Sequence, residues 1–475
     1  NIIGVKGIFY RAILTLGCLP YKAYIEIISI LKTLYRLIFS HKHFLEWMTS
    51  EEAEKQSKTT LLNYYKMMFF NVIVGIIFIG YTFITKSIVE QWIYVIIGAL
   101  WIIIPGIMCE ISMIPQKKSK NISENEKEYL RDIARKTWQY FNDYLNEENN
   151  YLIPDNYQEG RKQKVVPRTS STNIGLSLLA VISAYDLNFI TLEHTVDLLK
   201  KILYTIISLE KWNGHLYNWY DTKTKNPLIP RYISTVDSGN FVGYLYTTKI
   251  FLQNLNSQEL ESYVKYIEKL IEETNFKLLY NKENQIFSIG YNIEENKLTD
   301  SYYDLLASEA RQASLIAIAK KDVPVKHWNK LSRTLTTLGK YKGLISWSGT
   351  SFEYLMPNIN IPKYEGSLLD ESCKFMIMSQ KQYAKKLQIP WGISEAAFNL
   401  KDLQGNYQYK AFGIPWLGLK RGLADEMVSA TYGSILAINE EPQEVIKNLK
   451  ILEKYGMNGK YGFYESIDFT PERVE

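Results

Sequence analysis

Two uncharged apolar stretches near the start of this chain constrain its fold more than any other feature. Residues 67–85 read MMFFNVIVGIIFIGYTFIT, and residues 91–109 read QWIYVIIGALWIIIPGIMC. Each stretch is close to the roughly 20 apolar residues that a helix needs to cross the hydrocarbon core of a bilayer. The link between them, Lys86–Glu90, is short, so the pattern predicts a helical hairpin with both ends on the same side. The alternative is a pair of core helices buried in a soluble domain.

Lysines collect outside this hairpin rather than at its tip. They are Lys55, Lys58 and Lys66 before it and Lys117, Lys118 and Lys120 after it, with Lys86 alone at the tip. Cytoplasmic loops of membrane proteins carry such an excess of positive charge. Residues 61–115 are therefore predicted to form a transmembrane hairpin, with everything after residue 115 in the cytoplasm.

The segment before the hairpin, residues 1–60, has a different pattern. Ile13–Phe39 is apolar but is interrupted at roughly helical spacing by Pro20, Lys22, Glu26, Lys32 and Arg36. That spacing favours an amphipathic helix lying on the membrane surface or on a neighbouring domain over a span. The polar stretch from His41 to Lys58 is predicted to be a connecting helix.

Composition excludes several classes of protein. Lys and Arg total 55 against 50 Asp and Glu over 475 residues, an excess too small for a dedicated nucleic-acid binder. Three separated cysteines without CxxC spacing exclude a disulfide scaffold and a structural zinc site. Five histidines without HExxH spacing argue against a metallohydrolase, so neither metal nor cofactor is expected. Because the chain starts at Asn1 without Met, we expect a piece of a longer polypeptide.

The remainder, residues 120–475, alternates helical patterns with long loops. Helices are predicted at Asn121–Leu145, Thr172–Asp186, Thr191–Leu209, Asn240–Leu255, Ser257–Thr274, Asp300–Lys320, Val325–Leu338, Leu369–Leu387, Asp425–Asn439 and Pro442–Tyr455. Paired helices of this number predict an all-α (α/α)6 toroid. Lys277–Tyr280 and Gln285–Tyr291 are predicted to be short hairpins at its rim.

Four of the loops combine aromatic residues with hydrogen-bonding side chains. They are PDNYQE with RTSSTN (154–173), GHLYNWYD with PRYISTVDSGN (214–240), SWSGTSFEY (346–354) and PWGISEAAF with NYQY (390–409). Sugars need this combination, because their hydroxyls require polar partners and their C–H faces require apolar cover. The loops are predicted to meet at one mouth of the toroid. The alternative is that the polar residues form turns and the aromatic residues fill the core.

Substrate-contact candidates follow from these loops. They are Asn156, Gln158, Arg168, Asn218, Trp219, Tyr220, Asp221, Arg231, Asp237, Ser238, Asn240, Trp347, Ser348, Glu353, Tyr354, Trp391, Ser394, Tyr407 and Tyr409.

Glycoside chemistry requires two carboxyl groups about the scissile bond. Glu309 is predicted on a helix whose neighbouring alanines leave room for a ligand; alternatively it stabilises the helix dipole or pairs with Arg311. Glu395 is predicted at a loop-to-helix junction, where backbone N–H groups would stabilise its ionised form. For the acids Glu353, Asp237, Asp155, Glu159, Glu465 and Asp468, ligand binding or loop pinning is favoured over proton transfer. Composition alone leaves the choice of the pair open.

The strings PDNYQE, RTSSTNIGLSLLA, GHLYNWYDTKT, PRYISTVDSGN, SWSGTSFEYLMP, PWGISEAAFN, YQYKAFGIPWLGLKRGL and KYGFYESIDFTPER resemble the middle part of bacterial cyclic β-1,2-glucan synthases. The resemblance is dense over residues 120–475 and looser over Leu19–Glu110. In that family a glycosyltransferase domain elongates a linear glucan from UDP-glucose, a middle glucoamylase-like domain closes the ring, and a phosphorylase-like domain can follow. No DxD with a following QxxRW is present, so the polymerising site is expected outside these residues.

The resemblance implies Glu309 in LLASEAR as general acid/base and Glu395 in WGISEAAF as nucleophile. Ala396 stands where many relatives have Ser. The implied activity is an anomer-retaining transglycosylase that cyclises linear β-1,2-glucan without a cofactor, in a multi-pass protein of the bacterial inner membrane. An inverting β-1,2-glucan hydrolase and a non-catalytic glucan-binding module of a glycosyltransferase are the alternatives. The implied partners are linear β-1,2-glucan, the membrane, and the transferase and phosphorylase-like domains of the same polypeptide.

Overall fold

The computed structural model describes residues 5–42, 60–84, 87–112, 122–403 and 405–474. The chain divides into two compact units, Asn1–Ser119 and Lys120–Glu475, and each is described by itself. Most of the predicted connecting helix at 41–58 lies outside the described residues. The same holds for the flanking lysines other than Lys66, and for Lys86 at the predicted tip.

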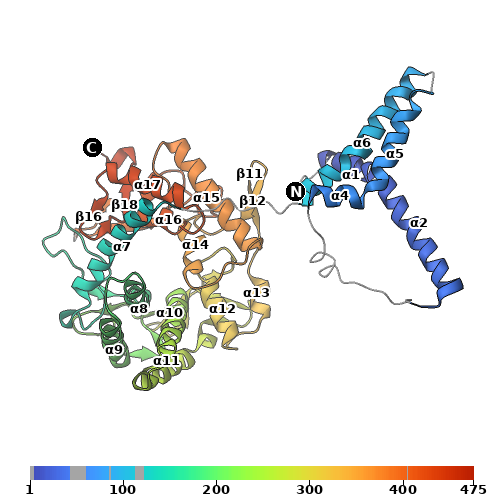
Figure 1. Cartoon of the computed structure of the whole chain (residues 1–475). Helices are drawn as coiled ribbons and strands as arrows, with labels where there is room; N and C mark the ends of the chain where they lie inside the picture. The colour runs from blue at the N-terminus through green and yellow to red at the C-terminus, as the bar shows by residue number, and fades with distance from the viewer. Residues whose placement is uncertain (1–4, 43–59, 85–86, 113–121, 404, 475) are drawn as a thin grey trace. The chain divides into compact units, whose positions relative to one another are not determined.

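The first unit consists of helices (Figure 1). They are α1 (Val5–Gly17), α2 (Leu19–Tyr35, extended by a π-helical turn Arg36–Ser40), α4 (Leu61–Met67), α5 (Phe69–Tyr81) and α6 (Ile88–Ser112). The second apolar stretch forms one helix, α6, of 25 residues. The first stretch is broken at Met68, where α4 and α5 meet at a bend of 72°.

The two apolar stretches therefore differ in the length of the helix that each forms. Helix α5 has 13 residues, which corresponds to about 20 Å and is short for a span. Among the described residues, α6 is the one helix long and apolar enough to cross a bilayer. The bent pairs α1–α2 and α4–α5 would each qualify only if taken as one broken span. The prediction of a hairpin of two long apolar helices is thus corrected for the first of them, which is broken at Met68.

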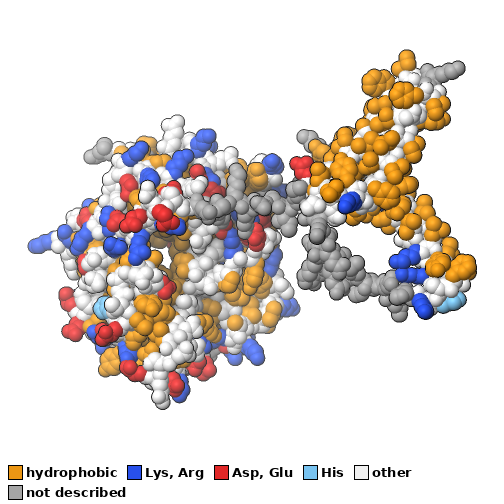
Figure 2. Space-filling view, in the orientation of Figure 1, with side chains coloured by type: hydrophobic (Ala, Val, Ile, Leu, Met, Phe, Trp, Pro, Cys, Tyr) orange, Lys and Arg blue, Asp and Glu red, His pale blue; other side chains and the backbone are white. Residues whose placement is uncertain are grey.

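Helices α5 and α6 pack closely through small residues. A Cβ atom on Gly75 would lie 2.7 Å from the carbonyl oxygen of Gly98, so the two backbones touch. Asn71 and Trp101 donate hydrogen bonds to the carbonyls of Gly17 and Leu16, at 2.6 and 2.9 Å, and thereby tie α1 to this pair. The outer faces are left covered with exposed isoleucine, leucine and phenylalanine side chains (Figure 2).

In the second unit the helices follow one another around a ring (Figure 1). They are α7 (Glu124–Tyr144), α8 (Ser171–Asp186), α9 (Leu192–Ser208), α10 (Thr235–Asn254), α11 (Glu261–Glu273), α12 (Arg311–Ala319), α13 (Lys326–Lys330), α14 (Ser351–Leu355), α15 (Leu368–Leu387), α16 (Thr431–Ile435) and α17 (Pro442–Lys454). Single 3₁₀ turns occupy Glu147–Asn149, Gln258–Leu260, Phe276–Leu279, Met356–Ile359 and Pro471–Arg473. Local signals account for several boundaries: α7 begins with the capping box of Ser123 and Glu126.

The unit is mostly helical but not all-α, because short antiparallel strands pair at the helix junctions. The pairs are β1 (Arg168–Thr169) with β4 (Tyr220–Asp221); β2 (Lys211–Trp212) with β3 (His215–Leu216); β5 (Tyr232–Ser234) with β8 (Gly290–Asn292), which also pairs with β9 (Lys297–Leu298); β6 (Tyr280–Asn281) with β7 (Ile286–Ser288), which also pairs with β10 (Tyr302–Tyr303); β11 (Leu335–Leu338) with β12 (Tyr341–Leu344); β13 (Glu395–Lys401) with β14 (Tyr407–Ala411); β15 (Val428–Ala430) with β18 (Ser466–Asp468); and β16 (Asn458–Gly459) with β17 (Gly462–Phe463).

Three predicted helices are wrong over part of their length. Asp300–Lys320 begins with β10 and a turn, and the helix starts only at Arg311. Val325–Leu338 stops being helical at Lys330 and ends in β11. Asp425–Asn439 contains β15 before α16. Strand pairing overrides local helix propensity in each case: β10 and β15 pair with the distant strands β7 and β18, whereas β11 forms a hairpin with the adjacent β12.

Candidate active site

Glu309 lies in a turn directly before α12, not on a helix face as predicted. The small residue Ala313 does not admit a ligand; it admits helix α10, because a Cβ atom on Gly239 would lie 2.4 Å from the Cβ of Ala313. The alternative pairing with Arg311 is also not seen. The guanidinium of Arg311 is buried and donates to the carbonyls of Glu353 and Tyr354, at 2.7 and 2.5 Å.

The surroundings of Glu309 favour its protonated form. The side chain is half-buried. Burial raises the pKa of Glu309 well above its usual value, and the nearby carboxylates of Glu395, Asp237 and Glu353 raise it further. This raised pKa favours the protonated form, which is the form that a general acid needs.

Glu395 is the first residue of β13, in register with Ala411 of β14. The predicted loop-to-helix junction is therefore wrong. Just upstream, Gly392 has φ +129°, and a Cβ atom there would lie 2.6 Å from the carbonyl of Ala430, so the turn into the strand needs glycine. Ala396 points to the opposite face of the strand and is fully buried, away from the Glu395 carboxylate.

The carboxylate of Glu395 has a phenolic donor in place of the backbone N–H groups that were predicted. The hydroxyl of Tyr409 donates to Oε2 of Glu395 at 3.2 Å. Burial and the charge of Glu353 raise the pKa of Glu395 to about 7, while the hydrogen bond from Tyr409 and the charge of Lys420 lower it. Glu395 thus remains able to ionise near neutral pH.

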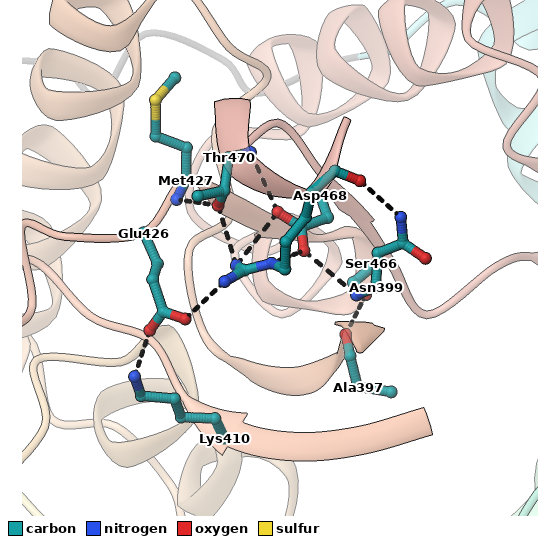
Figure 3. A network of polar contacts seen from close by, with 9 residues as sticks. Ala397, Asn399, Lys410, Glu426, Met427, Ser466, Asp468 and Thr470 are labelled. Atoms are coloured by element: carbon teal, nitrogen blue, oxygen red, sulfur yellow. Dashed lines mark hydrogen bonds and ion pairs between the residues drawn. The ribbon is translucent and has the colours of Figure 1, made fainter. Parts of the chain in front are cut away.

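The strand that carries Glu395 is anchored to the C-terminal segment (Figure 3). Asp468 accepts hydrogen bonds from Nε of Arg473 at 2.7 Å and from the backbone N–H of Asn399 at 3.1 Å. Arg473 also reaches Glu426 at 2.9 Å, and Glu426 pairs with Lys410 of β14. This C-terminal clamp therefore holds both strands of the hairpin.

Two further contacts complete the attachment of β13. Ser466 donates to the carbonyl of Ala397, and the backbone N–H of Ala397 donates to Glu465 at 3.1 Å. Glu465 and Asp468 thus bind the loop and the strand, in line with the pinning role expected for acids in these motifs.

Asp237 lies in the first turn of α10, where its backbone N–H is bonded to the N-cap Ser234. Thr172 donates to Oδ1 of Asp237 at 2.5 Å, and Asn218 donates to Oδ2 at 3.2 Å. A chain of hydrogen bonds also ends at Asp237 through Thr172. Gln312 donates to Asn240 at 3.2 Å, and Asn240 donates to the hydroxyl of Thr172 at 3.3 Å. Burial raises the pKa of Asp237, and its charge acts on Glu309. Residues of the first and second motif loops therefore surround the Glu309 side of the site.

Arg168 connects these loops further. Its guanidinium lies 4.4 Å from the ring centroid of Trp219 and 3.3 Å from Asp155. Asn156 donates to Asp155 at 2.8 Å, and Gln158 donates to Asn156 at 3.0 Å. The first loop also contacts the fourth, because Arg161 donates to Asn406 at 2.5 Å.

Glu353 pins the third motif loop. Its buried carboxylate accepts from the hydroxyl of Ser346 at 2.8 Å and from the backbone N–H groups of Ser348 and Thr350, both at 3.0 Å. The third loop lies against the fourth, because the backbone N–H of Phe352 donates to Ser394 at 3.1 Å. Within the third loop the ring of Trp347 is 60% exposed and is free for a ligand to stack on.

Several other candidates lie elsewhere. The side chains of Tyr220, Tyr354 and Trp391 are buried in the core, and Ser238 is bonded to the buried His215. Asp221 accepts from the backbone of Lys223 and Thr224 within its own turn, and Arg231 pairs with Glu294 at an exposed position. Each of these six side chains is thus engaged by the core or by a local partner.

Two tyrosines beside both carboxyls were missed. The pKa of Tyr303 is raised by burial, then by Glu309, and further by Asp237 and Glu395. The pKa of Tyr432 is raised by burial, then by Glu395, and to a smaller degree by Glu309. The hydroxyl of Tyr432 also donates to the carbonyl of Glu395 at 2.6 Å. Both had been placed inside predicted helices, where no pattern marked them as site residues.

Among the described residues, no group of three or more His, Cys, Asp and Glu side chains is arranged to hold a metal ion. The candidate catalytic groups are two carboxyl groups with different surroundings. The pKa of Glu309 is raised well above its usual value, and the pKa of Glu395 is raised to about 7.

Comparison with known proteins identifies relatives of this chain. The family model named Glycoamylase matches residues 301–474. The chain is 30% identical, over 94% of its length, to the cyclic β-(1,2)-glucan synthase NdvB of Rhizobium meliloti, and it spans about a fifth of that protein. The resemblance drawn from the sequence motifs is thereby confirmed.

Solved structures show the same fold at low identity. A glucoamylase-like protein from Bacteroides caccae superimposes with a TM-score of 0.62 at 14% identity, covering 73% of this chain and 88% of that one. An endo-β-1,2-glucanase from Chitinophaga pinensis gives 0.61 at 14% identity, covering 74% and 88%. An endo-β-1,2-glucanase from Talaromyces funiculosus, solved with sophorose, gives 0.60 at 14% identity, covering 73% and 80%. The fold of the second unit is therefore glucoamylase-like.

Proposed function

We propose that the unit Lys120–Glu475 is a transglycosylase that closes linear β-1,2-glucan into rings with retention of the anomeric configuration. The observation that carries this proposal is the pair Glu309 and Glu395. Both are half-buried, each has a raised pKa, and the charge of Glu395 acts on Glu309. The similarity to a cyclic β-(1,2)-glucan synthase supplies the substrate.

In the first step Glu395 attacks the anomeric carbon of an internal glucosyl unit. The bond to the glycosidic oxygen breaks, Glu309 protonates that oxygen, and the reducing-end portion leaves. A glycosyl ester on Glu395 keeps the free energy of the glycosidic bond, so no nucleotide sugar is needed. In the second step Glu309 takes the proton of the 2-hydroxyl at the chain's own non-reducing end, and that oxygen displaces Glu395. Two inversions retain the β configuration.

The surroundings of the two groups support this assignment of roles. Glu309 is held protonated by burial and by three nearby carboxylates, as a general acid requires. Glu395 receives a hydrogen bond from Tyr409 and lies near Lys420, and both favour the ionised nucleophile. Because the two charges are coupled, the working state is one proton shared unequally between two carboxyls.

A hydrolase is the second candidate, favoured by the likeness of the fold to endo-β-1,2-glucanases. An inverting hydrolase separates its carboxyls by about 6.5–9.5 Å, against about 5–5.5 Å for direct retention. In a retaining enzyme, proton transfer through a substrate hydroxyl would lengthen the distance between the two carboxyl groups without changing the stereochemistry. Analysis of the reaction products therefore distinguishes a cyclase from a hydrolase better than the distance between the two carboxyl groups does.

The test is incubation of the chain, in detergent, with linear β-1,2-glucan, followed by mass and reducing-end analysis. A cyclase yields rings, each lighter by one water than a linear chain with the same number of glucosyl units, together with the released reducing-end fragments, so the number of reducing ends is unchanged. A hydrolase increases that number. The Glu395→Gln variant is the control: if it binds glucan and the parent also produces nothing, the unit is a binding module instead.

For the first unit we propose membrane attachment. Its exposed faces are dominated by isoleucine, leucine and phenylalanine, a surface that water does not favour. The multi-pass topology in the bacterial inner membrane, with the second unit on the cytoplasmic side, is proposed from the lysine distribution in the sequence. Labelling of introduced cysteines by a membrane-impermeant reagent, in right-side-out and in inverted vesicles, tests this topology. Cysteines in the second unit should react only in inverted vesicles, which expose the cytoplasmic side.

A further inference from the structure

A polar cavity of about 360 Å³ lies between the first motif loop and the β13–β14 hairpin. Its walls include Gln158, Arg161 and Arg168 from the loop and Asn406 and Tyr407 from the hairpin. The hydrogen bond from Arg161 to Asn406 joins the two walls. Its volume falls within the range typical of sites for small organic ligands.

Two polar atoms of this lining have no hydrogen-bond partner among the described residues. Oε1 of Gln158 is an unused acceptor, and Nε of Arg168 is an unused donor, although both are shielded from bulk water. Buried polar groups are nearly always paired, so an unpaired donor and acceptor in one lining indicate a ligand that supplies both functions. A sugar hydroxyl donates and accepts through one oxygen.

The charges of the lining favour a neutral ligand. Arg168 is already paired with Asp155, and Arg161 is engaged with Asn406. Asp402 on the hairpin adds a negative charge and accepts from Asn406 at 2.8 and 3.0 Å. An anion has no proton to donate to Oε1 of Gln158, whereas a hydroxyl of a polyhydroxylated ligand can donate to that oxygen and accept from Nε of Arg168. Tyr407, which is 40% exposed, offers a ring for the apolar face of a sugar.

The cavity is connected to both carboxyls of the candidate active site. Tyr407 and Tyr409 are two residues apart on β14, so their side chains leave the same face of the strand about 7 Å apart, and Tyr409 bonds to Glu395. On the other wall, Arg168 stacks on Trp219, whose Nε1 donates to Asn218 at 3.1 Å, and Asn218 donates to Asp237 beside Glu309.

From these observations we propose that the cavity is an outer subsite, which holds one or two glucosyl units of the glucan chain beyond the units that flank the scissile bond. This inference rests on the proposed function. It adds a site that holds one end segment of the flexible glucan. Gln158 and Arg168 would contact its hydroxyl groups, and Tyr407 would cover the face of one glucose ring.

The test measures binding of linear β-1,2-glucan oligosaccharides of increasing length by calorimetry, in the Glu395→Gln background so that no turnover occurs. Affinity should rise stepwise once the chain is long enough to reach the cavity. Gln158→Leu removes the acceptor, and Arg168→Lys removes the Nε donor while keeping the positive charge. Each should weaken binding of the long oligosaccharides about 10-fold and that of the shortest binding ones less than 2-fold. Gln253→Leu, at an exposed position on α10, is the matched control and should change neither.

The inference is overturned if the Gln158→Leu and Arg168→Lys proteins show the same length dependence as their background. If either variant melts early, Tyr407→Ala, at a partly exposed strand position, replaces it with the same expected loss. Failure of the proposed function has a different signature: the parent protein would then neither bind nor convert β-1,2-glucan of any length, and both proposals would fall together. Normal conversion by the parent combined with an unchanged length dependence in the variants overturns the subsite alone.

Discussion

The surroundings of Glu309 and of Glu395 differ although the side chains are the same. Glu309 lies in a turn before α12, where burial and three nearby carboxylates act on it and all raise its pKa. Glu395 lies on a strand, where a tyrosine donor and a lysine charge offset part of the burial, and a clamp from the C-terminal segment holds the strand. The difference teaches that environment, rather than residue type, assigns acid and nucleophile. Substitutions around Glu309 and substitutions around Glu395 should therefore change the activity and its pH dependence in different ways.

The largest effect is expected from removal of the carboxyls themselves. Glu309→Gln should lower turnover by about 10²–10⁴-fold, since general acid catalysis contributes that much, and Glu395→Gln should lower it at least as far. The two losses differ in kind. A β-linked aryl glucoside whose leaving group needs no protonation should restore the first step in Glu309→Gln but not in Glu395→Gln.

Calorimetric melting checks that both variants remain folded. A variant that still cyclises linear glucan at near the parent rate would show that the wrong carboxylate was assigned. Glu353 and Asp237 would then be the next candidates.

The next effect concerns the Glu309 side. Asp237→Asn removes a negative charge that raises the pKa of Glu309, so that pKa should fall and Glu309 should lose its proton at lower pH. The basic limb of the kcat/KM profile should move to lower pH, with a loss of about 10- to 100-fold at pH 8 from this shift and from weaker substrate positioning. An unmoved basic limb would mean that Asp237 does not act on the general acid.

The clamp on the Glu395 side should matter less. Arg473→Ala removes the bonds to Asp468 and Glu426 and should lower the free energy of unfolding by about 1–3 kcal/mol, because two largely buried carboxylates lose a charged donor. We expect a drop in kcat of about 10-fold with little change in KM, since the strand that carries the nucleophile loosens. Arg421→Ala, at an exposed position, is the control. Equal kcat in both variants would leave the clamp with a purely structural role.

A smaller change is expected from Tyr409→Phe, which deletes the donor to Glu395. The pKa of Glu395, about 7 in the parent, should rise, because the hydrogen bond stabilises the ionised form. The acidic limb of kcat/KM should move to higher pH and lower the rate at pH 7 by about 3- to 10-fold. The basic limb should stay in place, in contrast to Asp237→Asn. A shift of both limbs would contradict separate control of the two groups.

The smallest effect concerns stability. Both glutamates have a pKa raised by folding, so each contributes stability that is complete below its unfolded pKa and is lost as pH rises through the folded value. Glu309→Gln should therefore raise the melting temperature by a few degrees at pH 8 and by much less at pH 4. Denaturation followed by circular dichroism at the two pH values measures the difference. A variant less stable than the parent at pH 8 would mean that the Glu309 carboxylate is stabilised when ionised.

Local patterns were enough for much of the helical scaffold. The helical spacing of α9, α15 and α17 predicted those helices to within one residue at each end, and the helix with the capping box of Ser123 and Glu126 was predicted to within three. These signals lie within one or two turns of the chain and need no tertiary partner. The motif strings were also enough to reveal the resemblance to a glucan synthase and, through it, the pair Glu309 and Glu395.

Composition was a weaker guide to individual aromatic residues. Trp219 and Trp391 stand in equally polar, aromatic-rich motifs, yet the ring of Trp219 stacks under Arg168 in the site whereas Trp391 is buried in the core. Tyr303 and Tyr432, which lie beside the carboxyls, had no distinguishing pattern at all. An aromatic side chain packs equally well against a sugar or a core, so its neighbours in space decide its role.

The amino-acid sequence by itself determined the apolar first unit, several helices of the second and, through the resemblance, the two candidate catalytic residues, because periodicity, capping and motif strings are properties of neighbouring residues. The tertiary structure alone decided that Glu395 begins a strand, since the alanines after it favour a helix locally while Tyr409 and Lys410 of β14 and Asp468 of β18 provide the bonds of a sheet edge. It also decided how strongly the pKa of each glutamate is raised. That property depends on charges and burial supplied by residues distant in the chain, and no local pattern contains them.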